Sequence, residues 1–147
     1  MKPSARAEFD ESIEQSSEWL RRLGDALHKD DREFSYTAFR AVMHTLRDTL
    51  IPEKAAALGT VLPMLLRGVY YEGWKPRVLR RGKDERDEFL EEVGEALPPR
   101  DEYDAERIVH AVFMLLSARL SEDEVEDALR ILPEDIKVFW PKATAAL

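Results

Sequence analysis

The sequence repeats itself at a shift of 70 residues without a gap, and this repeat constrains the fold more than any other feature. The matching positions are mostly apolar residues, glycines and prolines, which fill cores or end helices. They include Leu20 with Leu90, Gly24 with Gly94, Ala41-Val42 with Ala111-Val112, and Leu62-Pro63 with Leu132-Pro133. The sequence therefore predicts two similar tandem halves, 8–71 and 85–141, joined by a connecting segment over 72–84.

Each half reads as helical, because its apolar residues recur at alternating steps of three and four. The first expected helix carries such a core stripe at Phe9, Ile13, Leu20, Leu23 and Leu27. No stretch alternates with a period of two, so we expect no sheet. The predicted fold is all-α, with about three helices and a short terminal helix in each half, packed into one globular bundle.

Local signals mark several expected helix ends. Asp30 or Asp31 can cap the second helix, and Pro52 suits the first position of the third. Prolines 63, 98, 99 and 133 should break or stop helices, and Ser121 with Glu124 has the pattern of a capping box. Gly24 and Gly94 lie late in the first helix of each half, where we expect another helix to approach closely.

Composition narrows the classes of function. The 147 residues contain 22 Lys and Arg against 30 Asp and Glu, a net charge of −8 that disfavours nucleic-acid binding. Cysteine is absent, which excludes disulfides and thiolate metal sites. Scarce amides and cysteine are typical of thermophile proteins, although a GC-rich genome also accounts for the arginine bias. With no secretory signal and no apolar run long enough to span a bilayer, we expect a cytoplasmic protein.

Candidate chemistry is sparse. The three histidines, His28, His44 and His110, lack the spacing of metal-binding motifs, so we expect no metal and no cofactor. No phosphate-binding glycine loop and no nucleophile elbow is present. The acidic pairs and triplets stand at expected helix starts, where carboxylates complement the helix dipole. These absences favour a protein that is not an enzyme.

The densest aromatic cluster lies at 70–74, beside the turn residue Gly73. Its rings could stack on a planar ligand or anchor a partner, or they could wedge the connecting segment into the core. The match of Tyr70 with Trp140 favours the structural reading, whereas Trp74 has no counterpart. The basic run over 75–83 is either a solvated linker or an anion contact. The candidate ligand or partner contacts are Arg67, Tyr71, Trp74, Lys75 and Arg77.

Three segments carry a family resemblance: Phe9-Asp10-Glu11, the block over 62–76, and Leu132-Pro133-Glu134-Asp135 before Trp140-Pro141. With them the chain resembles the bacterial domain-of-unknown-function family 2267 over nearly its whole length. The Tyr-Tyr-Glu-Gly-Trp block over 70–74 is the most specific part. The resemblance implies a small helical bacterial protein, and it supplies no catalytic residues because the family has no assigned activity.

Three functional hypotheses follow. The first is a non-catalytic helical module that binds a protein partner, or a second copy of itself, through a face near Trp74. The second is a protein that binds a small molecule or nucleotide, or an enzyme, with its pocket between the halves and lined by Arg67, Tyr71 and Trp74. The third, nucleic-acid binding through 75–83, is disfavoured by the acidic charge.

Overall fold

The computed structural model describes residues 4–76, 85–98 and 104–142, and these residues form eight helices and no strand. The all-α prediction is therefore confirmed. The helices are α1 (Ala5–Ala26), α2 (Arg32–Thr49), α3 (Pro52–Gly59), α4 (Met64–Tyr71), α5 (Glu85–Glu95), α6 (Ala105–Arg119), α7 (Glu122–Ile131) and α8 (Glu134–Lys137).

The helices begin where the local signals placed them. The Asp31 side chain accepts a hydrogen bond from Phe34 N and caps α2, and Pro52 is the first residue of α3. Ser121 and Glu124 form the predicted capping box at the start of α7. Each side chain there accepts from the other residue's backbone N–H, which would otherwise lack a partner at a helix start.

The helix ends in the two halves correspond closely at the shift of 70. Leu50 follows α2 with φ −88° and ψ 153°, and Leu120 follows α6 with φ −87° and ψ 152°. Pro63 precedes α4 and Pro133 precedes α8, again with nearly equal backbone angles. These matches concern single positions, so the superposition of the two whole halves stays a prediction.

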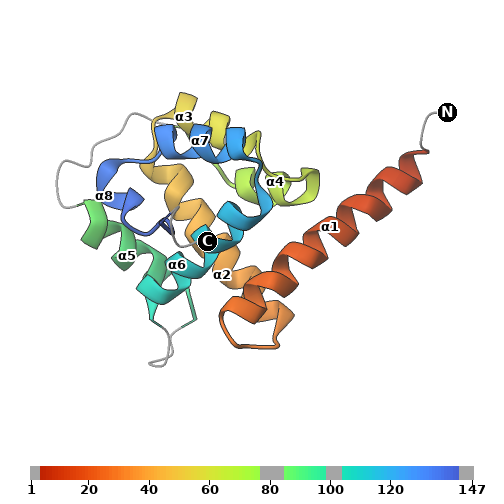
Figure 1. Ribbon diagram of the computed structural model, residues 1–147, viewed down its shortest axis with the longest axis horizontal. Helices are drawn as coiled ribbons and strands as arrows, with labels where there is room; N and C mark the ends of the chain where they lie inside the picture. Colours follow the sequence, from red (N-terminus) through yellow and green to blue (C-terminus); the bar gives the residue numbers. More distant parts are fainter. Residues whose placement is uncertain (1–3, 77–84, 99–103, 143–147) are drawn as a thin grey trace.

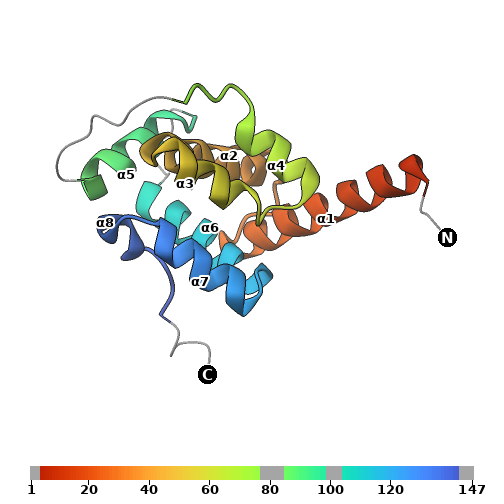
Figure 2. The ribbon, with the colours of Figure 1, turned by 90° about the horizontal axis from the view of Figure 1, so that it is seen from above.

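The halves are interleaved in space. The first helix of each half packs against the second helix of the other, α1 on α6 and α5 on α2, while α2 contacts α6 and α3 contacts α7. Figure 2 shows α3, α4 and α5 toward one side of the body and α6, α7 and α8 toward the other. Fully buried side chains from both halves form the core, among them Leu23, Phe39, Met43, Phe113 and Phe139.

The core stripe expected for the first helix is wrong at its beginning. Phe9 and Ile13 are 61% and 53% exposed, whereas Ser12 and Ser16 on the neighbouring face are buried. The reason is visible in Figure 1, where the first turns of α1 extend beyond the rest of the molecule. A helical stripe predicts one apolar face, but it does not say whether the same chain covers that face.

The prediction for the two glycines is right only in part. A Cβ on Gly24 would lie 2.8 Å from the Lys29 carbonyl oxygen and 3.0 Å from Ser35 Oγ, so the turn after α1 and the start of α2 approach closely there. A Cβ on Gly94 would meet no atom of the described residues within 4 Å. The expectation for Gly94 is therefore wrong. In the part of the chain that the structure describes, no helix has the length and apolar character of a membrane span.

Candidate functional site

The predicted aromatic residues attach α4 to α3. Tyr70 is fully buried and its hydroxyl donates to the Ala55 carbonyl at 2.6 Å, while the Tyr71 hydroxyl donates to the Ala56 carbonyl at 3.1 Å. Burial raises the pKa of the Tyr70 phenol, so the hydroxyl remains a donor at neutral pH. The Trp74 ring continues the cluster, with its centroid 5.4 Å from that of Tyr71. Through the hydrogen bond to the Ala56 carbonyl, Tyr71 thus contributes to the fold.

The other predicted contacts do not gather into one ligand site among the described residues. Arg67 donates from Nε and Nη2 to the Leu62 carbonyl, at 3.2 and 2.8 Å, and so closes the turn before α4. Trp74 and Lys75 line a hollow of about 10 Å³, which has room for about one water molecule. Arg77 lies outside the described residues.

A polar cluster that the sequence analysis missed binds the end of α4. Arg40, His44 and Arg47 lie on one face of α2, at spacings of four and three residues. Arg40 Nη1 donates to Glu72 Oε1 at 2.5 Å, and His44 Nε2 lies 2.7 Å from the Val69 carbonyl oxygen. We call these three residues the α2 clamp. Their regular spacing was the signal available in the sequence, but their partners are mostly backbone carbonyls, which no side-chain pattern reveals.

Arg47 is the buried member of the α2 clamp, with 5% of its surface exposed. Its Nη1 donates to the carbonyls of Tyr70 and Glu72 at 2.8 and 2.9 Å, and its Nε and Nη2 donate to the Asp48 carboxylate. The guanidinium thus satisfies carbonyls that have no partner within α4 and complements the negative end of its dipole. The clamp is saturated by the protein itself and leaves little capacity for a ligand.

Electrostatics at the clamp follow from burial and pairing. Burial of the half-exposed ring lowers the pKa of His44, so the neutral imidazole is favoured. The hydrogen bond from Arg40 lowers the pKa of Glu72, which keeps that carboxylate ionised. The imidazole therefore serves as a neutral donor to the Val69 carbonyl.

A second feature is a surface formed by α1 and α4. Phe9 and Ile13 on α1 and Met64 and Leu65 on α4 are 45–61% exposed. The backbone N–H of Leu65 donates to Ser12 Oγ at 3.1 Å, which holds the start of α4 against this part of α1. We call these four exposed residues the α1/α4 surface. Large exposed apolar patches are typical of protein contact sites.

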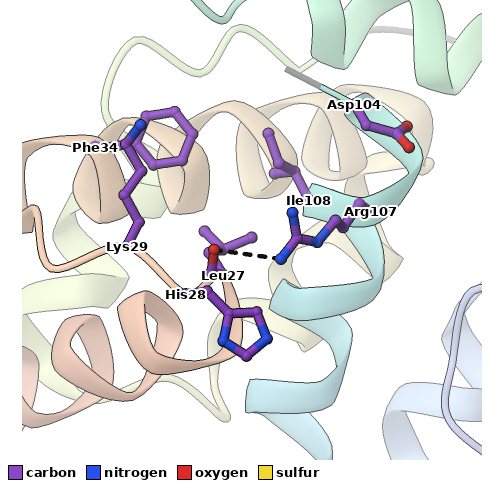
Figure 3. Close-up of a pocket in the computed structure, with 7 residues that line it drawn as sticks. All are labelled: Leu27, His28, Lys29, Phe34, Asp104, Arg107 and Ile108. Atoms are coloured by element: carbon purple, nitrogen blue, oxygen red, sulfur yellow. Dashed lines mark hydrogen bonds between the residues drawn. The ribbon is translucent and has the colours of Figure 1, made fainter. Parts of the chain in front are cut away.

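The third feature is a pocket of about 200 Å³ between the turn that follows α1 and the first turns of α6 (Figure 3). The pocket is lined by residues of both sequence halves. Its lining nevertheless includes none of the five predicted contact residues. Among residues 4–76, 85–98 and 104–142, no three His, Asp or Glu side chains come together as a set of metal ligands.

Comparison with known proteins gives a family without an assigned activity. A search of curated proteins found no match. The family model described as "Uncharacterized conserved protein (DUF2267)" matches residues 16–139, which include the α2 clamp, α4 and every helix of the second half. Because this match covers most of the sequence, the chain belongs to the DUF2267 family.

Proposed function

We propose that the protein is a non-catalytic interaction module that binds a helix of a partner protein on the α1/α4 surface. The observation that carries the proposal is the exposure of four large apolar side chains on two contacting helices, Phe9 and Ile13 beside Met64 and Leu65. Keeping these side chains in water loses the free energy that their burial would provide. The functional class is the one favoured by the sequence, but the four residues of this surface do not include Trp74.

The first turns of α1 support the need for a partner. They extend beyond the body of the molecule, and of residues 5–15 only Ser12 is buried. A helix in a protein gains most of its stability from packing an amphipathic face rather than from its own hydrogen bonds. A partner that covered Phe9 and Ile13 would supply that packing.

Gly68 is a second, independent observation on α4. It lies inside an eight-residue helix, and a Cβ added there would meet nothing within 4 Å. Glycine costs about 1 kcal/mol relative to alanine in a helix interior, and internal packing of the described residues does not require it here. A glycine on an open helix face permits the backbone of a second helix to approach closely. We therefore expect the partner to contact the surface with a helix.

Charge argues against a second copy as the occupant. Residues 5–15 contain four acidic side chains, Glu8, Asp10, Glu11 and Glu14, and one basic side chain, Arg6. None of these five forms an ion pair within the described residues. Packing two copies of α1 side by side would bring like charges together, which opposes association. The occupant is therefore another protein.

Site-specific photo-cross-linking tests this proposal. A benzophenone amino acid replaces Phe9 or Leu65 in separate variants, and each is irradiated in cells of the organism that encodes the chain. Val138 in the second half is 58% exposed and serves as the matched control position. We expect positions 9 and 65 to give the same protein adduct, whose cross-linked peptide maps to an amphipathic helix.

A Gly68→Leu variant provides the second arm, because a large side chain there blocks close approach without disturbing the interior. We expect it to remove the adduct at both positions. Equal adducts from position 138, adducts with a second copy of this chain, or adducts only with lipid would each contradict the proposal.

A further inference from the structure

The pocket between the two halves combines an apolar floor with a cationic wall. The floor is formed by Leu27, Phe34 and Ile108, which are 7%, 7% and 3% exposed. Leu27 and Phe34 come from the turn after α1 and the start of α2, and Ile108 comes from α6. Because these residues belong to the core, the floor is held rigidly by the packing of both halves.

Arg107 is the principal charged group of the pocket. Its Nη2 lies 3.4 Å from the Leu27 carbonyl oxygen, and it has no ion pair within the described residues. A guanidinium has five N–H donors, so this one long contact leaves most of them available to a ligand. Figure 3 shows the Arg107 guanidinium directed into the pocket from the α6 side.

Lys29 stands on the other side of the pocket. Its Nζ lies 4.9 Å from the centroid of the Phe34 ring, a cation–π distance, and Figure 3 shows the two residues together opposite Arg107. The acidic lining residue, Asp104, is turned away from the space in Figure 3 and caps α6 by accepting from Glu106 N at 3.1 Å. Among the described lining residues, Arg107 is therefore the cationic group that faces the space from the α6 side.

In the turn beside the pocket, backbone hydrogen bonds pair carbonyl groups that would otherwise repel an anion. His28 adopts φ 55°, the one positive value for a non-glycine residue in the described part of the chain. This conformation lets the N–H groups of His28 and Lys29 donate to the carbonyls of Asp25 and Gly24, at 3.1 and 2.9 Å. The carbonyls at the negative end of α1 are thus largely paired. Together the two bonds form a Schellman motif, which is a common way for a helix to end.

We propose that this pocket binds a small organic carboxylate that carries an apolar or aromatic body. Arg107 would bind the carboxylate with paired N–H donors, and the floor would cover the apolar body. A volume of about 200 Å³ is below the 300–1,000 Å³ usual for drug-sized ligands and cofactors. This size favours a ligand smaller than a nucleotide. The inference is independent of the α1/α4 surface.

Titration with benzoate, followed through backbone amide NMR shifts, tests the proposal. Benzyl alcohol tests the apolar body without charge, and inorganic phosphate tests charge without the body. We expect benzoate to bind with a dissociation constant of about 1–10 mM and to shift the amides of Leu27, Lys29 and Ile108. Both other probes should bind at least about tenfold more weakly. Saturation by benzyl alcohol or phosphate at the benzoate concentration would overturn the assignment.

Matched arginine variants locate the site. Arg107→Gln should weaken benzoate binding about tenfold or more, because it removes charge-assisted hydrogen bonds. Arg130→Gln removes an exposed arginine of α7 that pairs with Asp127, and it should leave binding unchanged. Both substitutions are at exposed positions, so both variants should fold. Equal weakening by the two variants, or shifts confined to other helices, would overturn the proposal.

Discussion

The C-terminal end of α4 is bound by polar side chains of α2, whereas the equivalent end in the second half is held by aromatic rings. Arg40, His44 and Arg47 form the α2 clamp, and their counterparts at the shift of 70 are His110, Met114 and Ser117. The clamp accompanies an eight-residue α4, while α8 has four residues. The described residues of the second half contain no such clamp, and there Phe139 packs against Phe89, His110 and Phe113.

The difference shows that corresponding regions of the two halves can be stabilised in two ways. One is hydrogen bonding to backbone carbonyls, and the other is the packing of aromatic rings. The buried Arg47 satisfies carbonyls at the end of α4 that would otherwise lack a partner. Aromatic packing needs no carbonyl partners, but it depends on the volume of each ring. The predictions below test this contrast, in order of expected effect.

The largest effect is expected for Phe139→Ala. Phe139 is fully buried, and its removal leaves a cavity among Phe89, Phe113 and the ring of His110. Large-to-small changes of this kind lower the free energy of unfolding by about 4 kcal/mol. Urea denaturation measures the loss, and the exposed neighbour Val138→Ala is the control, expected within about 0.5 kcal/mol. A loss below about 1 kcal/mol for Phe139→Ala would show that the rings do not hold this end.

Arg47→Met should lower the free energy of unfolding by about 3 kcal/mol, because the Tyr70 and Glu72 carbonyls lose their buried donor. Arg40→Met removes the more exposed ion pair to Glu72 and should cost less than about 1 kcal/mol. The same denaturation measurement distinguishes the two. Similar losses for both variants would break the distinction between the buried and the exposed members of the α2 clamp.

Gly59→Ala tests the contact between α3 and α4, where the second half has Leu129 at the equivalent position. The added Cβ would meet the Tyr71 hydroxyl and would lie 2.7 Å from Tyr71 Cζ. We expect a loss of about 2 kcal/mol from overpacking and the broken bond to Ala56, offset in part by helix propensity. Adding Tyr71→Phe to the Gly59→Ala chain should restore part of the lost stability, because it removes the hydroxyl. An unchanged melting temperature for Gly59→Ala would contradict the packing described.

Acidification should weaken the first half through His44. Its pKa is lowered by burial in the folded state, so the unfolded chain binds more protons as the pH falls below the ordinary value of 6.5. Stability should therefore be constant well above pH 6.5 and should decrease as the pH falls through and below that value. Glu72 affects the stability only at lower pH than His44 does, because its pKa in the folded state lies below the ordinary value of 4.5. In His44→Gln, which keeps a donor for the Val69 carbonyl, this decrease should become smaller; an unchanged decrease would exclude His44 as its source.

Local sequence signals specified the helices well because each depends on only a few neighbouring residues. Asp31, Pro52 and the Ser121–Glu124 capping box all lie where the pattern placed them. The α2 clamp escaped prediction because its partners are carbonyls more than 20 residues away. The same limit applies to the pocket, which is assembled from both halves.

The candidate contact residues show that a sequence pattern can also suggest a role that a residue does not have in the structure. The cluster around Tyr71 was conspicuous in composition, but a hydroxyl that reaches the Ala56 carbonyl is part of the fold. Phe9 and Ile13 fitted a core stripe and are exposed, because periodicity cannot distinguish a face buried within the chain from one left for a partner.

The most direct measurement of the proposed function is the photo-cross-linking yield from position 65 in a Phe9→Ser/Ile13→Ser variant. Both replaced side chains are exposed, so the free energy of unfolding should stay within about 0.5 kcal/mol of the parent chain. We predict that the yield of the partner adduct falls to that of the control position 138. An adduct that forms with unchanged yield in this stably folded variant would contradict the assignment of the α1/α4 surface.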